Sequence, residues 1–297
     1  MATLDTRFDQ FLRERRYLKN VSADTLDWYT TAWATFRRAP IDQPAEAAAF
    51  TRQHLEAFVV SLRDRGIRPV TCNTWIKALN AFCRWLHEHG DLPAVVRLPP
   101  LKTERRLVKT LEPAAIRALV MFKPRGFAQW RIHALTCALL DTGCRVQELL
   151  DARVVDFGFD DLLVTVVGKG DKQRRIPFSV DLRRILVRYL QQRERAGLCD
   201  ALMFPSRTNG QWGQRNALRS FYLLQRRLGL PRVGFHRLRH TFATEYLRNG
   251  GDVVRLSRTL GHAQLTTTMR YVQMLTGDLQ VAHVQASPLR HMRRSLQ

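Results

Sequence analysis

Apolar residues recur every three or four positions along residues 1–97, which is the spacing of one face of an α-helix. This pattern predicts four amphipathic helices, with Ser22 as the N-cap of the second, Gly66 after the third and Gly90 after the fourth. The apolar stripes are Phe8, Phe11 and Leu12; Leu26, Tyr29, Trp33 and Phe36; Leu55, Phe58, Val59 and Leu62; and Leu79, Phe82, Cys83 and Leu86. Four such helices predict a compact bundle.

Residues 98–110 break the helical pattern and are interpreted as a linker. Pro99 and Pro100 favour an extended start. The basic residues of this segment are Lys102, Arg105, Arg106 and Lys109, against the single acidic residue Glu104. When extended, a segment of this length spans roughly 40 Å. The linker is therefore long enough to hold two domains apart.

Residues 111–275 mix helical and β patterns. Pro113 suits the first turn of a helix, and another helix should end at Gly143. The helix that ends at Gly143 covers Trp130–Leu140. Further predicted elements are helices over Asp181–Arg195 and Arg215–Leu228 and β-rich runs over Leu162–Val167 and Arg174–Phe178. The two β-rich runs flank a Gly-rich turn and predict a β-hairpin. The expected fold is mainly α with a small β-hairpin: an N-terminal helical bundle followed by a mixed α/β domain.

Composition supports two domains and indicates the kind of partner. The chain has 297 residues, of which 45% are hydrophobic, enough for two separate cores. Its net charge of +22 and pI of about 11.0 favour binding to a polyanion, with nucleic acid as the leading candidate. A merely soluble basic protein, or one that contacts anionic membranes, is the alternative. No apolar run reaches the roughly 18 residues of a membrane span, and the N-terminus lacks a signal-peptide core. We therefore expect a cytoplasmic protein, associated with the nucleoid, and no membrane partner.

The cysteines indicate neither a disulfide framework nor a zinc site. There are five, an odd number, and none forms a CxxC pair. Most lie in apolar helical stretches, where a reduced cysteine behaves as a small hydrophobic residue. We interpret Cys144, which lies next to a candidate catalytic residue, as a packing residue as well.

Residues 235–271 concentrate reactive side chains. Short helices punctuated by glycines can bring His236, Arg239, His262 and Tyr271 into one pocket. Arg binds phosphate oxygens through a planar fork, His donates hydrogen bonds or moves protons near neutral pH, and Tyr is a competent oxygen nucleophile. Taken alone, each of these residues could instead cap a helix, lie solvated on the surface or pack in a core. The combination favours phosphate chemistry.

A second arginine motif lies upstream of this cluster. The segment Thr142–Leu150 places Arg145 directly after a Gly-Cys turn and Glu148 one helical turn later. The hairpin turn Gly168–Lys172 lacks the GxxxxGK[ST] pattern of nucleotide-binding loops.

Three motifs in this order resemble the tyrosine recombinases, also called the phage integrase or Xer-like family. The family's His-x-Leu-Arg-His-Thr-Phe-Ala-Thr motif corresponds to His236–Thr244. Its Leu-Gly-His motif corresponds to Leu260–His262, and its nucleophile motif to Thr267–Tyr271. Val146 and Gln147 depart from the residues usual after the first arginine, and neither bears on the chemistry. The resemblance extends over both predicted domains.

The resemblance implies a role for each candidate residue. Tyr271 would attack a scissile DNA phosphate, giving a 3′-phosphotyrosyl bond and a free 5′-hydroxyl. Arg145, Arg239 and His262 would stabilise charge on the phosphate oxygens. Lys169 on the hairpin would protonate the leaving oxygen, with Lys172 as the competing candidate, and His236 would accept the tyrosine proton. The remaining implied roles are Glu148 as a supporting residue and Arg105, Arg106, Lys172 and Arg237 as DNA contacts. No metal and no cofactor is expected, because two arginines already supply positive charge.

The resemblance also implies a domain plan and partners. Residues 1–97 would be a DNA-clamping core-binding domain, 98–110 a basic linker, 111–275 the catalytic domain of tyrosine recombinase type, and 276–297 a tail that docks on a neighbouring subunit. The partners would be double-stranded DNA with a specific recombination site and further subunits in a homo- or hetero-tetramer. A disordered basic tail is the alternative for the last segment.

Three other functions share parts of this pattern. A type IB topoisomerase uses the same side chains without joining two sites, and relaxation of supercoils without recombination would indicate it. A non-catalytic DNA-binding protein would be expected to have lost some of the family's catalytic residues, yet all six catalytic candidates match the family pattern. A metal-dependent nuclease would lose activity in EDTA. The motifs favour site-specific recombination over all three.

Overall fold

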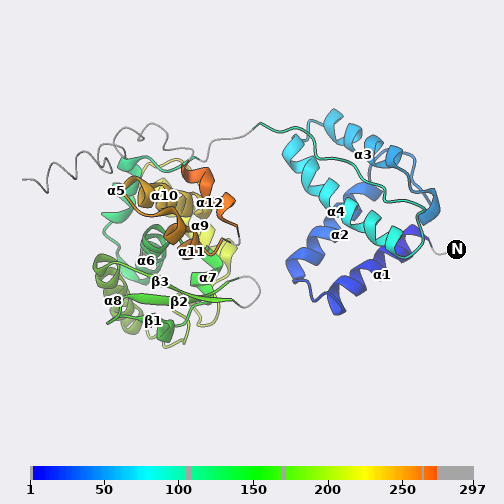
Figure 1. The fold of residues 1–297 in the computed structure, drawn as a ribbon. Helices are drawn as coiled ribbons and strands as arrows, with labels where there is room; N and C mark the ends of the chain where they lie inside the picture. Colours follow the sequence, from blue (N-terminus) through cyan, green and yellow to red (C-terminus); the bar gives the residue numbers. More distant parts are fainter. Residues whose placement is uncertain (1–2, 105–108, 169–171, 263, 273–297) are drawn as a thin grey trace, which may run out of the picture. The chain divides into compact units, whose positions relative to one another are not determined.

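The computed structural model describes residues 3–104, 109–168, 172–262 and 264–272. The chain divides into two compact units, Met1–Arg106 and Leu107–Gln297. Figure 1 shows the two units as separate groups of elements, and each has its own hydrophobic core. Arg105, Arg106, Lys169 and the tail 276–297 lie outside the described residues, so their predicted roles stay predictions.

The four predicted helices of the first unit are confirmed. Their bounds are α1 Leu4–Tyr17, α2 Ala23–Arg37, α3 Arg52–Asp64 and α4 Pro69–Glu88, with a short 3₁₀ helix at Ala47–Ala49. Aromatic rings fill the core between them. Phe8 stacks on Trp33 with ring centroids 4.8 Å apart and meets Phe82 edge-on at 5.2 Å. Most residues of the apolar stripes predicted from the sequence are buried, and Leu12, Leu26 and Tyr29 are partly buried, so the bundle follows from helical spacing.

The start of the predicted linker packs on α4. The side-chain amide of Asn80 donates to the carbonyl of Leu98 at 2.9 Å and accepts from its N–H at 3.0 Å. Asn73 does the same for Leu101, at 2.9 and 2.7 Å. Leu98 is buried in the core of the first unit. Leu98 and Leu101, at the start of the predicted linker, therefore pack on the bundle.

The second unit is built around one buried helix. The helices are α5 Pro113–Val120, α6 Gly126–Thr142, α7 Val146–Asp151, α8 Val180–Arg195, α9 Gln214–Arg227, α10 Phe235–Arg248, α11 Val253–Leu260 and α12 Leu265–Val272, with a 3₁₀ helix at Val154–Asp156. Every residue of α6 from Arg131 to Leu139 is buried, and the helix packs against α8, α9 and α10. A helix that is buried around its circumference needs such an interior position.

A three-stranded antiparallel sheet completes the second unit (Figure 1). Its strands are β1 Phe157–Gly158, β2 Leu163–Val167 and β3 Gln173–Pro177, in the order β1-β2-β3. Val164 pairs with Ile176, and both are buried. The predicted hairpin is confirmed, whereas the two-residue strand β1 gave no sequence signal. Among the described residues no helix is long and apolar enough to cross a membrane.

Candidate active site

Arg145 is placed by the turn between α6 and α7. Gly143 ends α6 in the left-handed conformation, with φ of 64°, which residues other than glycine rarely adopt. Arg145 follows as the N-cap of α7. Its backbone N–H donates to Oε2 of Glu148 at 2.8 Å, and its Nη1 donates to Oε1 at 2.9 Å. The Arg145 side chain keeps 42% of its surface exposed, so its guanidinium can reach a bound anion.

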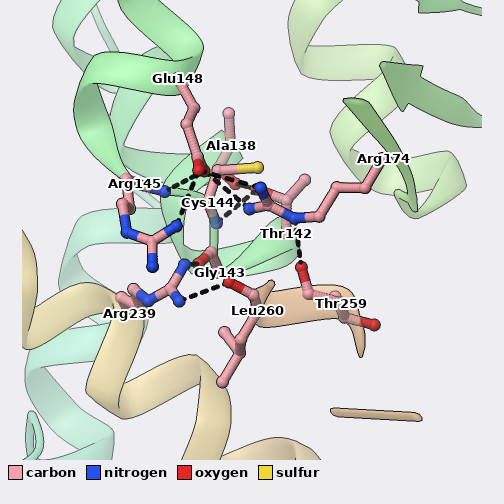
Figure 2. Close-up of polar contacts among 10 residues, drawn as sticks. All are labelled: Ala138, Thr142, Gly143, Cys144, Arg145, Glu148, Arg174, Arg239, Thr259 and Leu260. Atoms are coloured by element: carbon pink, nitrogen blue, oxygen red, sulfur yellow. Dashed lines mark hydrogen bonds and ion pairs between the residues drawn. The ribbon is translucent and has the colours of Figure 1, made fainter. Parts of the chain in front are cut away.

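Glu148 accepts four hydrogen bonds. Two come from Arg145, and Arg174 on β3 supplies the others, from Nη1 to Oε1 at 2.9 Å and from Nη2 to Oε2 at 2.7 Å (Figure 2). Burial alone would raise the pKa of the Glu148 carboxyl, but the hydrogen bonds and charges of Arg174 and Arg145 outweigh burial and lower it. Glu148 is therefore an ionised carboxylate that is hydrogen-bonded to both Arg145 and Arg174.

Arg239 lies on the first turns of α10 and is 3% exposed. It donates from Nη1 to the carbonyl of Gly143 at 2.7 Å and from Nη2 to that of Leu260 at 2.6 Å (Figure 2). Burial and the nearby Arg145 lower its pKa to about 10, which still leaves it protonated at neutral pH. These bonds join the end of α6, the start of α10 and the end of α11 at one charged group.

His262 directly follows the left-handed Gly261 that ends α11. Its Nδ1 lies 2.8 Å from the hydroxyl oxygen of the buried Thr268 on α12. Burial and the charges of Arg239 and Arg145 lower the pKa of His262 to about 4. The ring is therefore neutral at pH 7, and it can donate one hydrogen bond through a ring N–H.

Tyr271 makes its hydrogen bond to His240 and not to His236. Nδ1 of His240 lies 2.8 Å from the Tyr271 hydroxyl, and the His236 ring stands edge-on to His240 with centroids 4.9 Å apart. The resemblance implied that His236 accepts the tyrosine proton. The two imidazole rings lie one helical turn apart on α10, and Tyr271 of α12 contacts the second of them, His240. Tyr271 is 4% exposed, among Ala243 and Leu256, and burial raises its pKa.

Two basic cavities meet at Arg145. One, of about 380 Å³, is also lined by His236 and Arg239. The other, of about 710 Å³, is lined by Lys172, Arg174, Arg258 and His262 in addition to Arg145. No carboxylate side chain lines either cavity among the described residues, so both suit an anion.

The structure brings five of the six predicted catalytic residues into one region of the second unit. Arg145, His236, Arg239, His262 and Tyr271 are connected through shared cavities, hydrogen bonds or ring contacts. The sixth, Lys169, lies outside the described residues. Of the predicted DNA contacts, Lys172 is exposed and Arg237 is half-buried. In the described part of the chain, no group of three or more His, Cys, Asp or Glu side chains could hold a metal ion.

Two residues of this region were missed by sequence reasoning. His240 lies four residues after His236 in the same motif, so the two side chains share one face of α10. That spacing was the signal by which His240 could have been found. Arg174 carried no signal beyond its place on the predicted hairpin, because its partners lie 26 and 85 positions away. Cys144 is buried as expected, and burial raises its thiol pKa to about 11, as suits a packing residue.

Comparisons with known proteins agree with this site. A model of the phage integrase family matches residues 109–277. The tyrosine recombinase XerC of Xanthomonas axonopodis pv. citri (strain 306) is 30% identical over 281 residues, covering 90% of this chain and 91% of that protein. The tyrosine recombinase XerD of Proteus mirabilis is 28% identical over 300 residues, covering 96% and 93%.

Solved structures show the same fold. The Tn1549 transposon integrase in complex with circular intermediate DNA has a TM-score of 0.76 at 18% identity, covering 91% of this chain and 95% of that one. A lambda integrase dimer bound to a core site has a TM-score of 0.71 at 19% identity, with the same coverage.

The fold, the site and these matches together define the class: the chain belongs to the phage integrase family. Within that family it is a tyrosine recombinase, an enzyme of site-specific recombination. The family, the mainly helical fold and the recombinase function predicted from the sequence are thereby confirmed. These relatives are recombinases and integrases, and nothing in them favours a topoisomerase, a nuclease or a non-catalytic DNA-binding protein.

Proposed function

We propose that this enzyme cuts and rejoins double-stranded DNA at a specific recombination site through Tyr271. The Tyr271 oxygen forms a bond to the scissile phosphorus, the bond from phosphorus to the 5′-oxygen breaks, and a 3′-phosphotyrosyl link and a free 5′-hydroxyl result. The observation that carries this proposal is the convergence of Arg145 and Arg239 on one cavity, in the same unit as the Tyr271–His240 pair. Attack by the 5′-hydroxyl of another strand reverses the step and exchanges strands.

The two arginines provide a preorganised site for the phosphate. Arg239 is fixed by two carbonyls and Arg145 by Glu148, so neither has to reorganise when charge develops on the non-bridging oxygens. His262 adds a neutral hydrogen-bond donor on the other side of Arg145. His236 lines the same cavity as both arginines and contacts the phosphate from there. Charge stabilisation of this kind requires no metal ion.

Proton movement completes the step. His240 is the destination of the Tyr271 proton, since it already holds the hydroxyl and is neutral at pH 7, its pKa being lowered to about 4 by burial and by His236 and the neighbouring arginines. A bound phosphate offsets part of that positive charge and makes the imidazole more basic. Lys169 protonates the leaving 5′-oxygen. Because Tyr271 is buried, α12 has to shift before the hydroxyl contacts the phosphate.

Replacing His240 with Gln should slow formation of the covalent adduct by at least about 10²-fold, the usual loss when a general base is removed. Gln keeps a polar group beside Tyr271 but cannot take up a proton. Single-turnover rates at saturating DNA measure this effect, with His236→Gln as the matched comparison and a smaller expected loss. A His240→Gln protein that reacts as fast as the wild type, or faster, would show that the bond restrains the nucleophile instead of activating it.

The first unit supplies a basic surface for the duplex. Nine basic residues of this unit lie between its apolar stripes: Arg13, Arg15, Arg16, Lys19, Arg63, Arg65, Arg68, Lys77 and Arg84. All except the half-buried Arg15 are exposed, and none pairs with a carboxylate within the described ranges. Lys77 and Arg84 lie two turns apart on one face of α4. Residues 1–97 thus act as the core-binding domain, with Arg105, Arg106, Lys172 and Arg237 as further phosphate contacts.

Replacing Lys77 and Arg84 together with Ala should weaken binding to all DNA sequences alike. Each lost phosphate contact should also reduce the slope of log K against log salt by about 0.9. Arg52→Ala on α3 is the control, because Arg52 is already paired with Glu56 at 2.7 Å. Titrations at several salt concentrations measure both quantities. An unchanged slope, or a loss confined to one sequence, would remove this surface from the interface.

We further propose that four subunits assemble on two DNA sites, with residues 276–297 docking on a neighbour, and that the enzyme works on the nucleoid in the cytoplasm. All five cysteines are unpaired, as suits a reducing compartment.

Among the structural relatives, XerH was solved bound to its difH substrate. Recovering covalent adducts from cells and sequencing the joined DNA would identify the corresponding site for this enzyme and test the proposed function.

A further inference from the structure

We propose that Arg174 is a positioning residue for cleavage, which holds Arg145 and the chain leading to His262 in one geometry and keeps Arg145 available to the phosphate. This inference rests on the proposed roles of Arg145 and His262. It concerns a residue of β3 that belongs to none of the three motifs that identify the family.

All three nitrogens of the Arg174 guanidinium are occupied (Figure 2). Nη1 and Nη2 bind the two oxygens of Glu148, in the parallel geometry that only Arg offers a carboxylate. Nε donates to the carbonyl of Thr259 at 3.0 Å, in the last turn of α11. One side chain thus connects the sheet to α7, which Arg145 caps, and to the segment that ends in His262.

Two glycines form a close-fitting cradle for this guanidinium. A Cβ atom added to Gly261 would lie 3.0 Å from Cζ of Arg174, and one added to Gly168 would lie 3.2 Å from its Nη1. Gly261 also has a φ of 64°. Glycine is therefore needed at this position both for the left-handed backbone and for the close contact with Arg174. The Arg174 side chain is only 15% exposed. The glycine of the Leu260–His262 motif is therefore explained by Arg174 as well as by the end of α11.

Competition for Glu148 explains how Arg174 affects the reaction. An ionised carboxylate offers about four acceptor sites, two on each oxygen. Arg174 occupies one site on each Glu148 oxygen and the Arg145 backbone N–H occupies the second site on Oε2, so a single site, on Oε1, is left for the Arg145 guanidinium. Within the described residues, the Arg145 guanidinium donates only Nη1 to Glu148, and its Nε and Nη2 have no protein partner. Without Arg174, an ionised and buried Glu148 would draw the Arg145 fork onto itself. Those donors would then turn away from the phosphate.

The test is a double-mutant cycle between Arg174→Gln and Arg145→Ala, read as the single-turnover rate of adduct formation at saturating DNA. Arg174→Gln alone should slow the step by about 10²-fold, the scale of loss from a misplaced catalytic group, with the affinity for DNA at fixed salt unchanged. In the Arg145→Ala background, the same substitution should reduce the rate of adduct formation by a clearly smaller factor. Arg174→Lys, which keeps the charge but not the fork, should be nearly as slow as Arg174→Gln.

Arg175→Gln is the matched control, because Arg175 is the next residue of β3, exposed and paired with Asp161 on the surface. It should react at the wild-type rate. Four results would overturn the inference. They are a wild-type rate for Arg174→Gln, an equal fold-loss of rate from Arg174→Gln in the wild-type and Arg145→Ala backgrounds, a loss of DNA affinity without a loss of rate, and failure of both Arg174 variants to fold. If instead Arg145→Ala itself reacts normally, the proposed role of Arg145 fails first, so the two failures are distinguishable.

Discussion

Tyr271→Phe is expected to abolish the covalent protein–DNA adduct while leaving DNA binding intact. The substitution removes only the hydroxyl oxygen, which is the proposed nucleophile. Tyr271 is buried, so the Phe ring keeps its packing against Ala243 and Leu256. The cost to folding is the hydrogen bond to His240, about 1 kcal/mol. Loss of activity without loss of fold would assign the chemistry to that oxygen.

Tyr246→Phe is the control for this experiment. Tyr246 is the other tyrosine near the site, half-buried on α10 with its ring 5.7 Å from that of Phe242. Its position indicates packing, and we expect the Tyr246→Phe protein to form adduct at the wild-type rate. Both proteins are trapped on a nicked suicide substrate, denatured in SDS and resolved on a gel. Adduct from the Tyr271→Phe protein would contradict the assignment.

Arg145→Ala and Arg239→Ala should each slow adduct formation by about 10²- to 10³-fold, the loss typical of one charge-stabilising donor. Their effects on stability should differ. Arg145 is exposed, and its removal leaves Glu148 with the two bonds from Arg174. Arg239 is buried, and its removal leaves the carbonyls of Gly143 and Leu260 unpaired, which costs about 1–3 kcal/mol for each acceptor.

Thermal unfolding separates these two effects from the rates. Arg239→Ala should unfold at a clearly lower temperature than the wild type, and Arg145→Ala close to it. Arg248→Ala is the matched control on α10, since Arg248 is exposed and paired only with Glu245. It should change neither rate nor stability. Equal stability of Arg145→Ala and Arg239→Ala would show that the bonds from Arg239 to the backbone contribute little to the fold.

Local sequence signals were sufficient to predict most of the elements. Helical spacing predicted the bundle, and glycines that adopt a left-handed conformation, Gly143 and Gly261 among them, marked the ends of helices correctly. The same glycines position Arg145 and His262, because each of these residues follows the turn that the glycine makes. The places of Arg145 and His262 in the site could therefore be predicted from the sequence motifs without knowing how the helices pack.

Contacts that depend on packing angles were not predictable. Whether Tyr271 meets His236 or His240 depends on where α12 crosses α10, and the two histidines share one face of that helix. The bonds from Arg174 to Glu148 and Thr259 join segments that only the folded chain brings together. Likewise, nothing in the sequence indicated that Asn73 and Asn80 bind the backbone of Leu101 and Leu98, which follow α4.

The central claim is that Tyr271 joins the enzyme to DNA without the help of a metal ion. The most direct test is to trap the adduct on a suicide substrate in the presence of EDTA, digest the protein and sequence the peptide that remains on the DNA. We expect full adduct yield and a peptide modified at Tyr271, linked to a 3′-phosphate. A peptide modified at another residue, a link to a 5′-phosphate, or complete loss of the adduct on chelation would contradict the account.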